Sequence, residues 1–138
     1  MAITKQKGDI AEAYITYLLK KHGFNVLLPW GEDIRYDIVT EKNGVFKRIQ
    51  IKHVTSRNGS LAVPMRSCNN HQIIHYSRSH IDIVAAYEPH SNKVYFIPLK
   101  NHINRSTYKL RLVPAKNKQK KYIHLASLFE SNFSVLEK

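Results

Sequence analysis

The Asn43-Gly44 pair is the feature that most restricts how this chain can fold. It lies between two β-rich runs, IRYDIVT at residues 34–40 and VFKRIQIKHV at residues 45–54. Such a pair favours a two-residue hairpin turn, because both turn positions need a positive φ that Asn and Gly tolerate. The turn then places Lys42 opposite Val45, and every further pair moves one residue outward on both strands.

The same register predicts a polar cluster on one face of the hairpin. Asp37 is expected directly opposite Gln50, and Arg35 directly opposite Lys52. Directly opposed side chains share a face, with Cβ atoms about 5 Å apart. A loop one residue longer would turn these side chains to the other face, so the prediction depends on the turn. The apolar face of the second strand carries Ile49, Ile51 and His53.

Residues 7–24 have the periodicity of an amphipathic helix. Lysines occupy the last turn, and Gly23 stands where a C-terminal cap belongs. Glu12 shares a partly apolar face with Ile15. An acid in that position needs a cation, a metal or hydrogen-bond donors, because an unpaired buried charge is costly. A partly exposed Glu12 pairing with Lys5 or Lys20 is the structural alternative.

The remaining segments predict short strands and one more helix. IDIVAAY and VYFIPL are expected to pair antiparallel across the turn EPHSNK. Neither an internal repeat nor an interdomain linker is visible, so we expect one α/β (α+β) domain over residues 1–138, with a mixed sheet flanked by helices. The other expected elements are strands at 24–29, 60–65 and 106–114 and a short helix at 122–130.

The charge of the chain points to a partner. Lys and Arg number 22 against 10 acids, which gives a net charge of +12 and a pI near 9.9. A nucleic-acid partner is the leading explanation of such an excess, with a basic ribosomal or membrane-surface protein as the alternative. No apolar run is long enough to cross a bilayer, and the N-terminus lacks a signal peptide's apolar stretch. A single cysteine, Cys68, fits a cytoplasmic location.

The predicted cluster has the parts needed for phosphodiester hydrolysis. Two carboxylates, Glu12 and Asp37, and the amide oxygen of Gln50 suit an oxygen-preferring divalent cation such as Mg²⁺ (or Mn²⁺). Such a metal polarises a phosphate and helps to deprotonate a bound water. Lys52 is placed to orient that water or to stabilise charge on the phosphate. A cross-strand salt-bridge network is the structural alternative for Asp37, Gln50 and the nearby cations.

The segments GDIAEA, RYDIV and QIK resemble, in order and spacing, the PD-(D/E)XK nuclease superfamily. The resemblance implies a restriction-endonuclease-like core with a helix acid, Glu12, a first strand acid, Asp37, and a catalytic lysine, Lys52. Two positions depart from the motif: Tyr36 replaces its proline, and Gln50 replaces its second acid. Glutamine there is similar to the branch encoded within group I introns, the homing endonucleases of this fold. KHGFNVLLPWGEDIRYDIV, VYFIPL and LRLVPAKNKQKK also resemble that branch.

The resemblance implies a divalent-metal-dependent, site-specific endonuclease that cuts double-stranded DNA, as an intron homing enzyme does. Each chain offers one site and a duplex has two strands, so we expect at least a homodimer. The related enzymes suggest a tetramer. A Holliday-junction resolvase of the same fold is the nearest rival, although an acid would be expected at position 50. A non-catalytic DNA-binding module is the alternative from outside enzymology, and a restriction or repair nuclease remains a further enzymatic possibility.

Basic and polar side chains outside the cluster are candidates for contact with DNA. Positive charge in the C-terminal part suits the phosphate backbone, and Arg, Ser and Asn suit base edges. A solvated loop is the structural alternative for the basic run. The residues expected to bind DNA are Lys7, Arg35, Arg57, Arg66, Ser67, Asn69, Arg105, Lys116, Lys118, Lys120 and Lys121.

Three further features carry weaker expectations. His71 and His75 would share a face if their segment were a helix, and with His80 they raise the idea of structural zinc. Zinc sites usually have closer-set ligands and more cysteines, so we expect these histidines in a polar, DNA-facing or exposed segment instead. Cys68 is expected to be partly buried and without chemistry. Trp30, beside Pro29, is expected to pack against the protein, with base stacking as the alternative.

Overall fold

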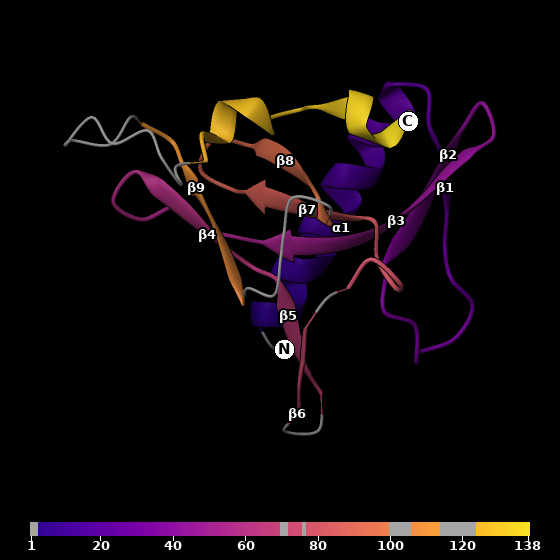
Figure 1. Ribbon diagram of the computed structural model, residues 1–138, viewed down its shortest axis with the longest axis horizontal. Coiled ribbons are helices and arrows are strands. Elements are labelled where there is room, and N and C mark those ends of the chain that lie inside the picture. Colours follow the sequence, from indigo (N-terminus) through magenta and orange to yellow (C-terminus); the bar gives the residue numbers. More distant parts are fainter. Residues whose placement is uncertain (1–2, 70–71, 76, 100–105, 114–123) are drawn as a thin grey trace.

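A computed structural model describes residues 3–69, 72–75, 77–99, 106–113 and 124–138 (Figure 1). A central five-stranded mixed sheet has the order β1-β2-β3-β7-β8. It is formed by β1 (Asn25–Leu27), β2 (Ile38–Lys42), β3 (Val45–His53), β7 (Ile83–Glu88) and β8 (Lys93–Pro98). All neighbouring strands are antiparallel except β3 and β7, which are parallel.

Helix α1 (Ile3–Lys21) covers one face of this sheet. Its buried stripe is Ala11, Ile15 and Leu19, spaced by four residues so that they face the same way. The helix begins four residues earlier than the sequence predicts. It ends as expected at Gly23, whose φ of +87° permits the hydrogen bond from the Phe24 amide to the Leu19 carbonyl at 3.0 Å.

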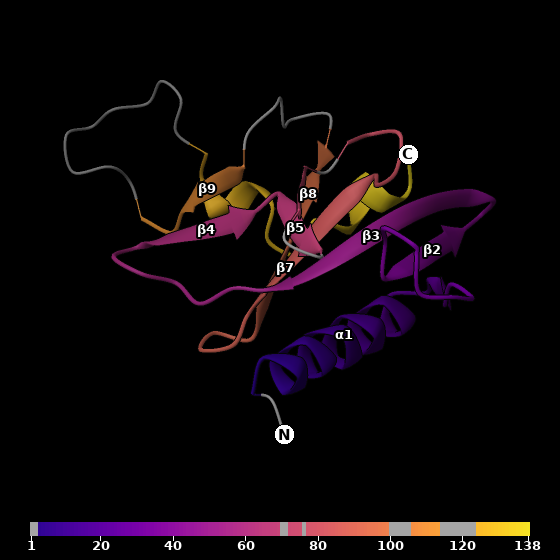
Figure 2. The ribbon, with the colours of Figure 1, turned by 90° about the horizontal axis from the view of Figure 1, so that it is seen from below.

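The other face of β7 and β8 is covered by a second, two-stranded sheet (Figure 2). That sheet pairs β4 (Ser60–Pro64) with β9 (Thr107–Arg111), and its leucines and valine pack against Val84. The connection from β3 to β7 therefore contains strands, whereas parallel strands are more often joined through a helix. Each face of the central sheet has its own apolar core, which explains why β7 is buried on both sides.

The remaining elements are a hairpin and two short helices. Strands β5 (Arg66–Asn69) and β6 (Gln72–His75) pair antiparallel and extend away from the central sheet (Figure 1). The idea of a helix carrying His71 and His75 is therefore wrong, because this segment pairs as strands; His71 itself lies outside the described residues. Of the helix expected at 122–130, the described residues form only a short 3-10 helix, η2 (Ala126–Leu128), and a second one, η3 (Phe133–Leu136), follows it.

The predicted hairpin register is confirmed between β2 and β3. Lys42 pairs with Val45, and the ladder continues to Ile38 and Ile49. Asn43 and Gly44 have φ values of +52° and +81°, as a two-residue turn with two positive φ angles requires. The antiparallel β7–β8 pair is also confirmed. Among the described residues, no helix is both long and apolar enough to span a bilayer.

Candidate active site

The candidate site lies where β2 leaves the edge of β3. The ladder stops at Ile38 and Ile49, so the last residues of β3 pair with β7 alone. The expected pairs of Asp37 with Gln50 and of Arg35 with Lys52 do not form. The chain enters β2 from an irregular loop, and the Asp37 amide donates to the Ile49 carbonyl at 2.8 Å, which is out of step with the ladder.

Asp37 instead occupies the open edge of β3 with its side chain. Its Oδ2 accepts a hydrogen bond of 2.7 Å from the amide of Ile51. The carboxylate thereby takes the place that a neighbouring strand's carbonyl would fill, and it satisfies a backbone donor on a partly buried edge. Burial raises the pKa of Asp37, while the Ile51 hydrogen bond and the charge of Lys52 act in the opposite direction.

Gln50 and Lys52 share one face of β3, as predicted. Their neighbours on β7 are Val84 and Ala86, which belong to the core between the two sheets. The Lys52 ammonium donates to the carbonyl of Arg66, the first residue of β5, at 3.3 Å. Burial lowers the pKa of Lys52, and the charge of Asp37 opposes that shift. The lysine is thus held near Asp37 in a partly buried setting.

Glu12 reaches the site from helix α1. It follows the buried Ala11, so it stands at the border of the helix face that packs on the sheet. Burial raises the pKa of Glu12, and the negative charges of Asp37 and then Asp9 raise it further. Glu12 and Asp37, which are far apart in the sequence, therefore lie close enough for their charges to repel each other. No ion pair of Glu12 with a lysine is present among the described residues, so the surface-pair alternative is not supported.

The donor set fits a hard divalent cation. Asp37 and Glu12 could offer carboxylates to a metal, and the half-buried amide of Gln50 could offer a neutral oxygen. The described residues contain no group of three His, Cys, Asp or Glu side chains suited to a metal, so a third protein ligand would have to be of another type, such as an amide oxygen. Two acids with raised pKa values beside one cation leave negative charge that a divalent ion would neutralise.

The expected DNA-contact residues fall into three groups. Four cationic residues are exposed. Lys7 lies on α1 and Arg35 on the loop before Asp37, while Arg57 follows β3 and Arg66 begins the β5–β6 hairpin. Ser67 and Asn69 lie on strand β5. The others lie outside the described residues, and they are Arg105, Lys116, Lys118, Lys120 and Lys121.

The structure adds an ionic contact that the sequence analysis missed. Arg48 and Asp82 form a bidentate pair, with Nε to Oδ2 and Nη2 to Oδ1 both at 3.0 Å. The pair joins β3 to the residue before β7 and so fixes the strands that carry the candidate site. From the sequence, Asp82 can be recognised as an acid directly before the apolar strand that starts at Ile83. Nothing in the sequence indicates that its partner is Arg48.

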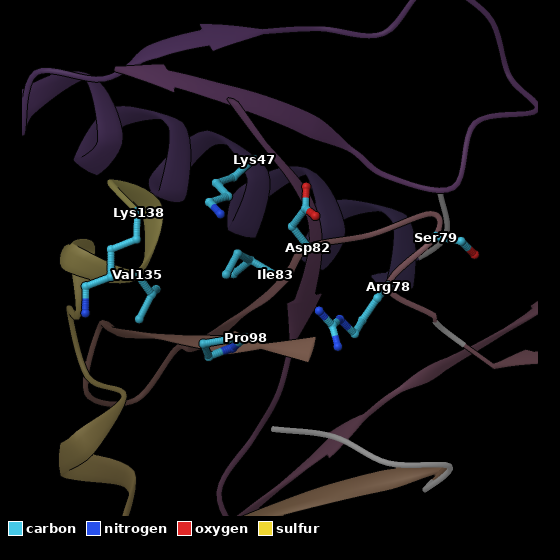
Figure 3. A pocket seen from close by; sticks show the side chains of 8 residues that line it. All are labelled: Lys47, Arg78, Ser79, Asp82, Ile83, Pro98, Val135 and Lys138. Carbon is cyan, nitrogen blue, oxygen red and sulfur yellow. The ribbon is translucent and has the colours of Figure 1, made fainter. Parts of the chain in front are cut away.

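Asp82 also borders a cavity of about 550 Å³ at the end of the sheet (Figure 3). Figure 3 shows cationic side chains around an apolar floor. Neither Asp37 nor Lys52 borders this cavity, which is therefore distinct from the candidate site. The lining residues are Lys47, Arg78, Ser79, Asp82, Ile83, Pro98, Val135 and Lys138.

Solved structures with this fold include two nucleases. The bacterial homing endonuclease I-Ssp6803I matches with a TM-score of 0.75 and 25% identity, over 97% of this chain and 93% of that one. Hjc of Archaeoglobus fulgidus, a Holliday junction resolvase, matches with a TM-score of 0.54 and 16% identity, over 96% of this chain and 97% of that one. At that identity the second match shows the fold alone.

Sequence comparison agrees with the fold. No curated protein matches the chain. A family model described as PD-(D/E)XK endonuclease matches residues 2–132, nearly the whole chain. The expected restriction-endonuclease-like α/β core is confirmed by this match and by the similarity to I-Ssp6803I. The chain is therefore a nuclease that belongs to the PD-(D/E)XK endonuclease family.

Proposed function

We propose that the protein is a divalent-metal-dependent endonuclease that cuts double-stranded DNA at a specific site, as an intron homing endonuclease does. The observation that carries the proposal is the seating of the Asp37 carboxylate on the Ile51 amide, beside Lys52 and Glu12. The solved structure with the higher TM-score and identity of the two, I-Ssp6803I, is a homing endonuclease, and the net charge of +12 suits DNA.

The proposed metal ligands are Asp37, Glu12 and Gln50. Nucleases of this family generally use divalent metal ions, and we propose Mg²⁺, with Mn²⁺ as a substitute. When bound, the metal polarises the scissile phosphate and lowers the pKa of a bound water. The Ile51 amide fixes one oxygen of Asp37, so its carboxylate is oriented before any ligand arrives. Gln50 offers an oxygen without charge, which leaves the site less negative than one with three acids.

We propose that Lys52 stabilises the charge that develops on the phosphate or orients the attacking water. Its ammonium is held by the Arg66 carbonyl, so the cation is already positioned and its reorganisation during the reaction is small. The lowered pKa of Lys52 reflects the burial that also strengthens its interaction with a phosphate anion.

Cleavage of both strands requires two such sites, so we propose at least a homodimer, with a tetramer as the larger assembly. Sedimentation of the protein with and without DNA measures the assembly. We also propose a cytoplasmic location, which the single cysteine supports.

The test is cleavage of a plasmid library that carries randomised and candidate intron-insertion sites. The wild type is assayed with Mg²⁺, Mn²⁺ and EDTA, beside Asp37→Asn and Lys52→Ala. Matched controls are Glu130→Gln and Lys93→Ala, which remove the partners of a surface ion pair remote from β3. We expect metal-dependent double-strand cuts at one long site, lost in the first two variants and kept in the controls.

A four-way DNA junction is included as a competitor. Preferential cleavage of the junction would replace the homing proposal by a junction-resolving one. Plasmid and junction that both stay intact, while the protein binds DNA equally well with and without metal, would contradict a nuclease role. That result would favour a non-catalytic DNA-binding module.

A further inference from the structure

Trp30 is the most exposed large apolar side chain in the described part of the chain, at 99%. The expectation that it packs against the protein is therefore wrong. It lies on the segment of residues 28–36 between β1 and β2, which we call the Trp30 loop. The loop is anchored at its far end, where Tyr36 packs against the core between the two sheets. A fixed loop that holds its tryptophan away from the protein presents both faces of the indole to a partner.

The Trp30 loop leads directly into the candidate site, because Asp37 is the next residue after it. In Figure 1 the loop and the β5–β6 hairpin both extend below the central strands. The hairpin begins at Arg66, whose carbonyl accepts the hydrogen bond from Lys52. Two projections, each joined to one side of the candidate site, thus extend to the same side of the molecule.

The charge of the Trp30 loop indicates whether it would contact the bases or the phosphate backbone of DNA. Residues 28–36 contain Glu32 and Asp33 but no lysine, and their one cation is Arg35. A loop with a net negative charge is repelled by the phosphate backbone, although the chain as a whole is strongly basic. Contact of this loop with the bases is therefore favoured over contact with the phosphate backbone. An indole suits that role, since every base has a π-face on which it can stack.

We propose that Trp30 stacks on a DNA base next to the scissile phosphate, as a wedge that holds the strand against the candidate site. The inference rests on the proposed nuclease function and adds a DNA-contacting residue outside the PD-(D/E)XK motif. Apolar wedges between bases unstack a step and bend the duplex, and a bent duplex brings the backbone closer to a recessed site. The loop that carries Trp30 ends directly at Asp37, so a strand held by Trp30 is held by the segment that leads into the candidate site.

The chain contains a single tryptophan, so its fluorescence reports on Trp30 alone. The wild type is titrated with a mixed-sequence duplex of about 30 base pairs at low salt in EDTA, so that no cleavage occurs. Binding is followed in parallel by the anisotropy of a fluorescein label on the duplex. We expect the tryptophan emission to fall by about half or more at saturation, and its quenching by acrylamide to weaken, because a stacked indole is shielded from solvent.

Affinity and its salt dependence give a second readout. We expect Trp30→Ala to weaken DNA binding about tenfold, within the range known for loss of one base stack, and Trp30→Phe to retain most of the affinity. The slope of log K against log salt should stay unchanged in Trp30→Ala, because no phosphate contact is lost. Arg66→Ala should lower that slope by about one if Arg66 contacts a phosphate. Phe46→Ala removes another exposed aromatic ring, on β3 near the Asn43-Gly44 turn, and should change neither quantity.

Three results would overturn the inference, and they differ from a failure of the proposed function. Anisotropy that reports binding while the tryptophan emission and the affinity of Trp30→Ala stay unchanged would show that the loop does not touch DNA. A blue shift of the emission that grows with protein concentration without DNA would assign Trp30 to a contact between copies of the chain. If the slope of log K against log salt were lowered in Trp30→Ala but equal to the wild-type slope in Arg66→Ala, the loop would act through phosphates. No anisotropy change at low salt would instead contradict DNA binding itself.

Discussion

Removal of the Arg48–Asp82 pair tests how the strands that carry the candidate site are held. Asp82 accepts hydrogen bonds from the backbone amide, Nε and Nη2 of Arg48, at 2.8, 3.0 and 3.0 Å. The Asp82 amide returns a bond of 2.9 Å to the Arg48 carbonyl. The guanidinium also donates to the carbonyls of Arg78 and Ser79, both at 2.9 Å. The side chain of Asp82 therefore connects β3 to β7 just before their parallel pairing begins.

The magnitude follows from these contacts. Hydrogen bonds to charged groups contribute about 1.5–3 kcal/mol each when buried, and Asp82→Ala removes three of them. The two side chains are 32% and 30% exposed, so solvent screens the pair and reduces the sum. We expect Asp82→Ala to lower the free energy of unfolding by about 2–3 kcal/mol. For a chain of this length that corresponds to a fall in Tm of about 8–12 °C.

The assay is urea unfolding at neutral pH, followed by far-UV circular dichroism, for Asp82→Ala, Arg48→Met and the double variant. We expect a coupling energy of about 1–2 kcal/mol between the two positions. The control is Glu130→Ala, which breaks the exposed Lys93–Glu130 pair and should cost at most about 0.5 kcal/mol. A loss for Asp82→Ala no larger than that of the control, or additive single variants, would refute this reasoning.

The pH dependence provides a separate check. Burial acts to raise the pKa of Asp82, but the hydrogen bonds and charge of Arg48 outweigh it and the pKa is lowered below 3.8. A carboxyl with a lowered pKa in the folded state contributes stability above its ordinary pKa and loses it as the pH falls through the folded value. The difference between wild type and Asp82→Ala should therefore shrink below pH 4. A difference that stays constant down to pH 2 would contradict the ionised pair.

Three further predictions concern the candidate site. Gln50→Glu should tighten Mn²⁺ or Mg²⁺ binding about tenfold in calorimetric titration, because a third carboxylate adds negative charge, and equal affinities would refute the proposed role of Gln50. Asp37 and Glu12 have raised pKa values, so metal affinity should still increase with pH above the ordinary pKa values of Asp and Glu; a profile that is already flat there would argue against their being ligands. Because the pKa of Asp37 is raised in the folded state, its ionisation costs more there than in the unfolded chain. The free energy of unfolding therefore decreases as the pH rises through the folded-state pKa. Asp37→Asn should thus raise Tm at pH 7, and raise it less near pH 4; a lower Tm at pH 7 would contradict the buried charge.

Local sequence signals predicted the elements of the fold well where the chain itself supplies the constraint. The Asn43-Gly44 turn fixes its own register, because both residues adopt a positive φ and the strands follow from the turn. The end of α1 at Gly23 is equally local. The order and spacing of the acids and lysine predicted the PD-(D/E)XK family, and the family match confirms that prediction.

The geometry of the candidate site depended on tertiary structure instead. The sequence alone suggested that Asp37 would face Gln50 across a continuous ladder, but the loop before it ends the ladder at Ile38. The Asp37 carboxylate then accepts a hydrogen bond from the Ile51 amide. The sequence pattern does not predict this contact, because it forms at the edge of β3 that β2 leaves unpaired. The hairpin of β5 and β6 was likewise not predicted, because a polar segment without alternation gives little strand signal.

The sequence by itself determined the helix, the turn and the main strands, since each depends on neighbours within a few residues. Tertiary structure alone decided that Glu12 feels the charge of Asp37, that Arg66 holds Lys52, and that Asp82 pairs with Arg48. It also decided that Trp30 stays exposed. These features join segments distant in the chain, and their energies depend on burial and distance, which exist only once the sheet and its two cores have assembled.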